Sequence, residues 1–141
     1  MNIRQAKLND YDQLIPLLNG FVGEDRYSKK DFDSFETVIT SQNNHLFVAE
    51  EQNVLVGFVT FSVRYVIRYP RPIAELDELF VNNSQRKKGI GKALLQQVIK
   101  TAQKKDCYRL YIESHYQHKV AHKLYEASGF ENYGYHFYIK L

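Results

Sequence analysis

The chain has 141 residues, 44% hydrophobic and 25% charged, which is an ordinary composition for one folded domain over residues 1–141. The net charge of +3 suits a small anionic ligand and is too low to indicate nucleic-acid binding. A single cysteine, Cys107, excludes an internal disulfide and agrees with a cytoplasmic location. No signal peptide is evident, and no apolar run approaches the roughly 20 residues that span a membrane.

In the first half of the chain, hydrophobic periodicity predicts alternating strands and helices. We expect strands over residues 3–7, 45–50, 54–65 and 73–81, and helices over residues 10–18 and 31–39. The first helix is expected to end at Asn19-Gly20, and Pro16 is a position where it can bend or shorten. A turn is expected at Gln52-Asn53.

The second half contains the clearest helix, residues 89–105, whose apolar residues recur with a 3.6-residue period. A strand over 108–113 and a helix over 120–128, stopped by Gly129, follow it. Residues 130–141 are expected to form one or two closing strands. The alternation of strands and helices predicts an α/β (α+β) fold.

Residues 85–92 (Gln-Arg-Lys-Lys-Gly-Ile-Gly-Lys) follow a predicted strand and open the clearest helix. Two glycines let backbone N–H groups approach an anion, and the helix N-terminus adds partial positive charge. The cationic side chains are Arg86, Lys87, Lys88 and Lys92. The spacing fits neither a dinucleotide fingerprint nor a Walker A loop. The segment indicates a pyrophosphate-binding turn, and local chemistry alone leaves a solvated basic turn as the alternative.

The motif Arg86-x-x-Gly89-x-Gly91 resembles the acyl-CoA signature of the GCN5-related N-acetyltransferases, the GNAT family. Downstream, Ala121-x-x-Leu124-Tyr125-x-x-x-Gly129-Phe130 is similar to the second signature of that family. One position departs, because His118 stands where the family often has an asparagine that contacts pantetheine. The acidic stretch 74–79 and residues 118–125 are also similar to aminoalkylphosphonate N-acetyltransferases.

The resemblance implies a central, mostly antiparallel mixed sheet of six to seven strands, flanked by about four helices. It implies acetyl-CoA as cosubstrate and a small-molecule primary amine as acceptor, acetylated by direct attack in a ternary complex. The residues it assigns to acetyl-CoA binding are Leu79, Phe80, Val81, Arg86, Lys87, Lys88, Gly89, Ile90, Gly91, Lys92, His118 and Tyr125. A backbone N–H near Phe80 or Val81 would stabilise the oxyanion.

Catalysis requires a base, because an alkylamine with a pKa near 10.4 is protonated at neutral pH. By resemblance we favour Glu75 as this base, with Glu78 and Asp77 as rivals. Strand alternation predicts Glu75 and Asp77 on one face and Glu78 on the other. Tyr125 matches the usual general acid of the family, which protonates the departing thiolate.

Other residues have weaker interpretations. His115, His118 and His122 have a spacing that metal sites can use, but we expect surface histidines and no metal. Arg64, Arg68 and Arg71 are candidates to bind an acceptor phosphonate or carboxylate, and a homodimer stays open. Alternative acceptors are a protein or peptide, a polyamine or an aminoglycoside. A non-catalytic acetyl-CoA-binding module is a further alternative, and we expect neither a nucleic-acid nor a membrane partner.

Overall fold

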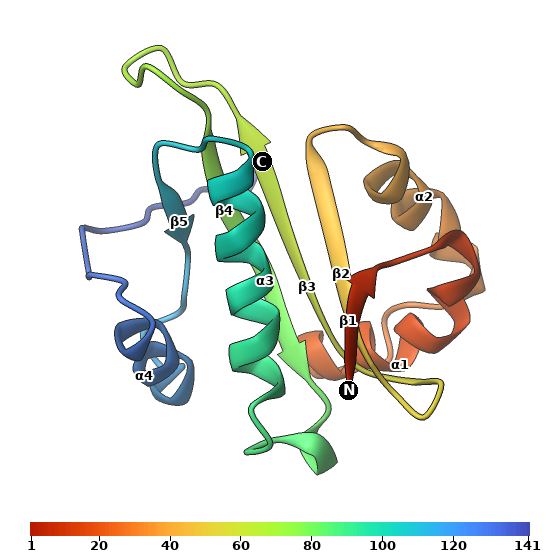
Figure 1. The fold of residues 1–141 in the computed structure, drawn as a ribbon. Helices are drawn as coiled ribbons and strands as arrows, with labels where there is room; N and C mark the ends of the chain where they lie inside the picture. Colours follow the sequence, from red (N-terminus) through yellow and green to blue (C-terminus); the bar gives the residue numbers. More distant parts are fainter. The chain divides into compact units, whose positions relative to one another are not determined.

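The computed structural model describes residues 1–141, which form two compact units, Met1–Tyr111 and Ile112–Leu141. The elements of the first unit are β1 (Asn2–Gln5), α1 (Tyr11–Val22), α2 (Phe32–Thr40), β2 (Asn44–Glu51), β3 (Val54–Arg64), β4 (Ile73–Val81) and α3 (Ile90–Lys104) (Figure 1). β5 (Leu110–Ile112) reaches the boundary, and the second unit contains α4 (Lys119–Ala127).

The sheet has five strands in the order β1-β2-β3-β4-β5. Strands β1 to β4 are antiparallel neighbours. The residues that lead into β5 meet the start of β4, because Tyr108 N–H donates to Pro72 C=O (2.7 Å) and Ala74 N–H to Arg109 C=O (2.9 Å). The two strands therefore begin side by side and run in the same direction, and α3 supplies the crossover that a parallel pair requires.

In the first unit, α3 packs on one face of the sheet and α1 and α2 pack on the other. A Cβ atom on Gly57 of β3 would lie 3.3 Å from Leu94 of α3, so this face of β3 meets α3. On the opposite face, Phe58 and Val48 share a core with residues of α1 and α2, including Leu14 and Phe35. The sheet thus separates a face covered by one long helix from a face covered by two shorter ones.

The first helix continues past its predicted end at Asn19-Gly20. α1 reaches Val22 and ends at Gly23, whose φ of 80° is left-handed. Gly20 has a packing role, because a Cβ at this position would lie 2.8 Å from the Phe80 ring. Its small size permits close contact between α1 and β4 rather than ending the helix. Pro16 lies inside the helix without ending it.

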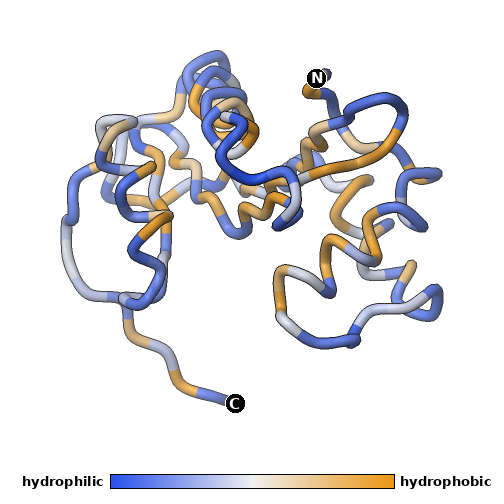
Figure 2. Tube along the Cα trace, turned by 90° about the horizontal axis from the view of Figure 1, so that it is seen from below, coloured by the Kyte–Doolittle hydropathy of each residue, from blue (hydrophilic) through white to orange (hydrophobic).

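The fold class is confirmed, while the expected six to seven strands are five, and residues 130–141 form no strand. Hydrophobic and hydrophilic residues alternate toward the C-terminus (Figure 2). Alternation indicates how side chains would face, but a strand exists only if its backbone finds a partner strand. Aromatic residues such as Tyr135 and Phe137 are 93% and 86% exposed. No helix of the chain combines the length and the apolar character needed to cross a membrane.

Candidate active site

The last residues of β4 bond to β3 on one side only. Asn82 N–H donates to Val56 C=O (2.9 Å). A Cβ on Gly57 would lie 2.8 Å from the backbone oxygen of Phe80, so this oxygen also faces β3. Because backbone groups alternate in direction along a strand, Phe80 and Asn82 both turn their N–H and C=O groups toward β3. The Phe80 ring packs against Phe21, with ring centroids 6.4 Å apart.

Leu79 and Val81 turn their backbone groups toward the opposite edge of β4. Val81 C=O accepts a hydrogen bond there from Nε of Arg86 (3.3 Å). β5 has only three residues and lies beside the start of β4, so no strand of the first unit covers this edge. An extended chain of amide groups can bind such an edge as an added strand does. Of the three predicted residues, Leu79 and Val81 have the suitable backbone geometry.

The turn before α3 has an unusual backbone. Gly89 has a left-handed φ of 80°, and Lys87 also has a positive φ, 65°. No side chain caps the N-terminus of α3. The first-turn N–H groups are therefore available to an external acceptor. The Ile90 side chain is buried, so only its backbone can contribute to such a site.

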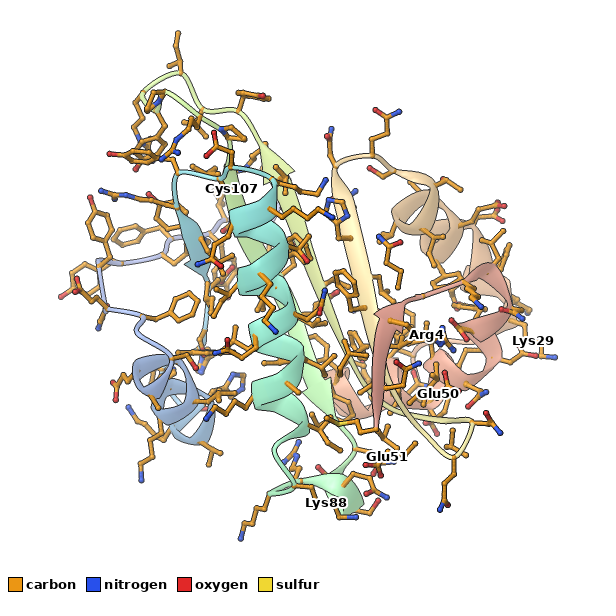
Figure 3. All side chains as sticks on the ribbon, in the orientation of Figure 1. Arg4, Lys29, Glu50, Glu51, Lys88 and Cys107 are labelled. Carbon is orange, nitrogen blue, oxygen red and sulfur yellow. The ribbon has the colours of Figure 1, made fainter.

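The cationic residues of this turn are exposed and form none of the ion pairs in the structure. They are Arg86, Lys87, Lys88 and Lys92. Lys88 lies in the turn before α3 (Figure 3), where its Nζ donates to Oε1 of Gln85 (2.6 Å). Unpaired cations beside free N–H groups fit a pyrophosphate well. The residues predicted to bind the nucleotide end of acetyl-CoA thus lie together in the first unit.

Strand β4 carries a β-bulge in its middle. Thr60 of β3 pairs with Glu78, whereas the next residue, Phe61, pairs with Leu76. Asp77 is therefore the extra residue, without a partner of its own across the ladder. Such bulges bend a strand and redirect its side chains.

The bulge overturns the expected distribution of acidic side chains. Simple alternation predicts Glu75 and Asp77 on one face of the sheet and Glu78 on the other. In the structure Glu75 pairs with Ser62 and Glu78 pairs with Thr60. Ser62 and Thr60 are two residues apart on β3 and so share a face. Glu75 and Glu78 consequently lie on the same face, because the extra residue restores their phase.

Side chains of β3 hold Glu75 and Glu78. Glu75 accepts a hydrogen bond from Arg64 (2.7 Å), in an ion pair whose side chains are 22% and 51% exposed. Glu78 accepts a hydrogen bond from the hydroxyl of buried Thr60. Each carboxylate is therefore held in place by a side chain of the neighbouring strand.

The carboxyl group of Asp77 has a raised pKa. The side chain is exposed, but desolvation by the surrounding atoms raises its pKa from 3.8 to about 6, and the charges of Glu75 and Glu78 act in the same direction. A hydrogen bond from Ser62 and the charge of Arg64 oppose this rise. A carboxylate with a pKa near 6 is mostly ionised at neutral pH and is a stronger base than an ordinary aspartate.

Asp77 and Glu78 line a hollow of about 210 Å³ in the first unit. It is lined by Val38, Asn44, His45, Thr60, Phe61, Asp77 and Glu78. At roughly 30 Å³ for each water molecule, this volume matches about seven waters or one end of a small organic molecule. An acidic hollow of this kind suits a protonated amine.

The remaining predicted residues belong to the second unit. His118 is exposed at the start of α4 and does not cap the helix with its side chain. Tyr125 is half-buried, and burial raises the pKa of its hydroxyl, which is therefore protonated and able to donate at neutral pH. His115 and His118 lie 5.8 Å apart between ring centroids, while His122 is 3.1 Å from the Ser114 hydroxyl.

Sequence reasoning missed Thr60 and Ser62, which hold Glu78 and act on Asp77. A signal was present, because Thr60, Ser62 and Arg64 alternate with apolar residues in an otherwise hydrophobic strand. Polar residues at every second position mark one face of a strand. Their partners could not be identified without the bulge at Asp77.

Comparisons with known proteins identify the family and the fold of the chain. The family model "Acetyltransferase (GNAT) family" matches residues 11–130. The uncharacterized N-acetyltransferase YhfO of Bacillus subtilis is 28% identical, with 93% of this chain and 90% of that protein covered. The uncharacterized N-acetyltransferase MJ1207 of Methanocaldococcus jannaschii is 29% identical, with 92% of this chain and 60% of that protein covered.

Solved structures share the fold at lower identity. A ribosomal-protein-alanine N-acetyltransferase from Brucella melitensis has a TM-score of 0.84 at 23% identity, with both chains fully covered. AAC(6')-Iy, in complex with the bisubstrate analog CoA-S-monomethyl-acetylneamine, has a TM-score of 0.84 at 23% identity, over 99% of this chain and 97% of that one. Their names describe different acceptors, so the fold leaves the acceptor open. With a family match that covers most of its length, the chain belongs to the GNAT family of acetyltransferases, which use acetyl-CoA as acetyl donor.

Proposed function

We propose that this enzyme transfers the acetyl group of acetyl-CoA to the primary amine of a small molecule. The observation that carries the proposal is the acidic hollow at the β4 bulge, on the strand whose later residues leave a backbone edge uncovered. A site for an ammonium group and a site for an amide-rich arm thus follow one another along a single strand. The family match spans residues of both units, which supports their acting as one domain.

Asp77 is the proton acceptor in this proposal. An alkylammonium group with a pKa near 10.4 must lose a proton before its nitrogen can attack a carbonyl carbon. The raised pKa of Asp77, about 6, suits it to accept that proton, directly or through water. Glu78, held by Thr60, stabilises the ammonium before transfer. Glu75, the candidate favoured by sequence, is paired with Arg64 and acts through its charge on Asp77.

Residues 79–92 provide the donor side. Backbone groups of Leu79 and Val81 bind the pantetheine arm, and the turn at 86–92 binds the pyrophosphate. Acetyl-CoA supplies the thioester carbon that the amine attacks. The N–H of Val81 faces the uncovered edge and is the candidate oxyanion donor. The N–H of Phe80 is not a candidate, because the backbone groups of Phe80 face β3.

Tyr125 and His118, in the second unit, keep in this proposal the roles that the family resemblance implies. The Tyr125 hydroxyl is protonated at neutral pH, which a general acid for the leaving thiolate requires. His118 occupies the position of a pantetheine contact in the family signature and can donate one hydrogen bond. A covalent acetyl-cysteine is disfavoured, because burial raises the pKa of Cys107 and lowers its thiolate fraction.

The acceptor is a small molecule in this proposal because the acidic hollow has a volume of only about 210 Å³. Proteins, polyamines and aminoglycosides present larger or more highly charged groups. The free thiol of Cys107 agrees with the cytoplasm as the location of the reaction. A homodimer stays open as the oligomeric form.

The experiment measures CoA thiol released from acetyl-CoA with a panel of amino acids, aminoalkyl acids, polyamines, aminoglycosides and lysine peptides. We expect turnover with small amines, and strongly reduced turnover at low acetyl-CoA concentration with Arg86→Glu, which reverses a charge in the pyrophosphate turn. Acetyl-CoA binding is titrated in parallel. Binding without turnover of any amine would indicate a non-catalytic acetyl-CoA-binding protein, and turnover of peptides alone would contradict the small-molecule acceptor.

A further inference from the structure

Three polar residues follow one face of β3 beside the acidic bulge. Thr60 contacts Glu78, Ser62 acts on Asp77, and Arg64 contacts Glu75. The residues alternate along the strand, so their side chains lie on the same face, which also carries Glu75 and Glu78. The hydroxyl groups of Thr60 and Ser62 thus lie at one end of this row, beside Glu78 and Asp77. The guanidinium group of Arg64 lies at the other end, beside Glu75.

Most N–H donors of the Arg64 guanidinium group have no hydrogen-bond acceptor in the structure. Its only hydrogen bond in the structure runs from one terminal nitrogen to Oε2 of Glu75, at 2.7 Å. Its side chain is 51% exposed, and its charge acts on Asp77 as well. A guanidinium group has a planar array of N–H donors that binds an oxyacid through two parallel hydrogen bonds. Arg64 can therefore bind a second anion while it remains paired with Glu75.

The spacing between the two ends of the row suits one small molecule. Glu75 pairs with Ser62, and Glu78 pairs with Thr60, two residues earlier on β3. Two residues of an extended strand span about 7 Å. Because Arg64 contacts Glu75, its guanidinium group lies about this distance from Glu78 along the sheet. A short carbon chain could therefore join an ammonium group at Asp77 and Glu78 to an anion at Arg64.

We propose that the acceptor carries an oxyacid group in addition to its primary amine, and that Arg64 binds this oxyacid. The inference rests on the proposed acetyl transfer and names the substrate class of that same site. Asp77 and Glu78 hold the ammonium group, and Arg64 holds the carboxylate, phosphonate or sulfonate at the other end. An acceptor with cationic groups alone would place a second positive charge against Arg64, which this arrangement disfavours.

The test compares acceptors that share a two-carbon spacer. β-Alanine, aminoethylphosphonate and taurine carry an oxyacid, ethylamine has no second charge, and ethylenediamine has a second cation. The measured quantity is the ratio of kcat/KM for each compound to that for ethylamine. Charge-assisted hydrogen bonds predict a preference of about tenfold to a hundredfold for at least one oxyacid. Arg64→Gln should abolish this preference and Arg64→Lys should restore part of it.

The matched control is Lys29→Gln, which removes one positive charge from the exposed Lys29–Asp12 pair (3.5 Å), in the short turn before α2 (Figure 3). It should retain the wild-type ratio. A wild-type preference for ethylenediamine, or an oxyacid preference that survives in Arg64→Gln, would overturn the inference.

A binding measurement separates this inference from the proposed reaction. Each amine is titrated calorimetrically into wild-type and Arg64→Gln protein saturated with CoA, so that no acetyl transfer is required. Oxyacid binding that depends on Arg64 supports the inference even if no amine is acetylated, in which case the proposed reaction alone fails. Equal binding by the two proteins, or binding of no oxyacid amine, overturns the inference. Thermal unfolding of each variant verifies that it is folded.

Discussion

The two halves of β4 offer different chemistry on one continuous strand. At Leu79 and Val81 the strand presents backbone groups along an uncovered edge, and the turn that follows adds cations. At residues 75–78 it presents carboxylates, redirected by a bulge and held by side chains of β3. Backbone recognition is indifferent to most side-chain changes, whereas the acidic half depends on particular residues. The difference suggests a constant donor site beside an adaptable acceptor site.

The largest effect is expected at the bulge. Asp77→Asn removes the proposed proton acceptor and should lower kcat/KM for the amine by about 10²–10⁴-fold, the usual contribution of general-base catalysis. In the wild type, activity should rise with pH and reach half its plateau near pH 6, because the ionised form of Asp77 is the base. The pH profile of Asp77→Asn should lack this rise near pH 6, while that of Asp12→Asn, a change to an exposed acid, should keep it.

A wild-type profile without a transition near pH 6, or full activity in Asp77→Asn, would assign the base to another residue. Parallel Glu75→Gln and Glu78→Gln profiles would then show which carboxylate replaces it.

Tyr125→Phe should lower kcat by about 10²-fold or somewhat less, because positioned proton transfer contributes 10²–10⁴-fold and the thiolate can also take a proton from water. The comparison variant is Tyr116→Phe, an exposed tyrosine of the same unit, which should be neutral. An unchanged kcat, with chemistry shown to limit the rate, would remove Tyr125 from the mechanism.

Arg86→Glu tests the donor half. It should raise the KM for acetyl-CoA by about tenfold to a hundredfold, because a charge-assisted contact is replaced by repulsion. The KM for the amine should change little, since the acidic hollow lies on the other half of the strand. Lys104→Glu makes the same charge change at the opposite end of α3 and serves as control. Equal effects of the two variants would reduce the role of Arg86 to general surface charge.

The smallest effect is expected for Thr60→Val, which preserves shape and removes the hydroxyl that donates to Glu78. Loss of one such hydrogen bond, worth about 1 kcal/mol, should raise the KM for the amine about fivefold. Thr101→Val removes a hydroxyl from α3 that bonds to Gln97 C=O and should leave this KM unchanged. A loss of acetyl-CoA affinity in Thr60→Val would contradict the separation of the two halves.

The donor half could be predicted from sequence because its motif is local. The glycines and cations of residues 86–92 lie in the turn and helix start that they themselves form, and their binding of acetyl-CoA stays a prediction. β4 itself was predicted with its observed bounds, Ile73–Val81, since its apolar residues and flanking turns are also local signals. Acetyl-CoA as the donor agrees with the family to which the chain belongs.

The acceptor half could not be predicted in the same way, because it depends on pairing between strands. Nothing in residues 73–81 indicates that Asp77 is an extra residue, so alternation placed Glu78 on the wrong face relative to Glu75. The partners Thr60 and Arg64 become visible only with the register of β3 against β4. The strands predicted over residues 130–141 are absent for a similar reason. An alternating segment forms a strand only when it pairs with another strand, and its own sequence does not specify that partner.

The bulge at Asp77 also has a consequence for engineering new activities. Substitutions at residues 60 and 78, which line the hollow, and at residues 62, 64 and 75 beside them would alter the proposed acceptor side without changing the backbone edge at Leu79 and Val81. A combinatorial library restricted to these positions can therefore search for new acceptors while every member retains the same donor chemistry. Deleting Asp77 would instead remove the bulge and leave a regular ladder, in which Leu76 still pairs with Phe61 and Glu78 with Thr60. The extra residue is therefore a position where the bend of the acceptor half can be removed without changing the strand register on either side.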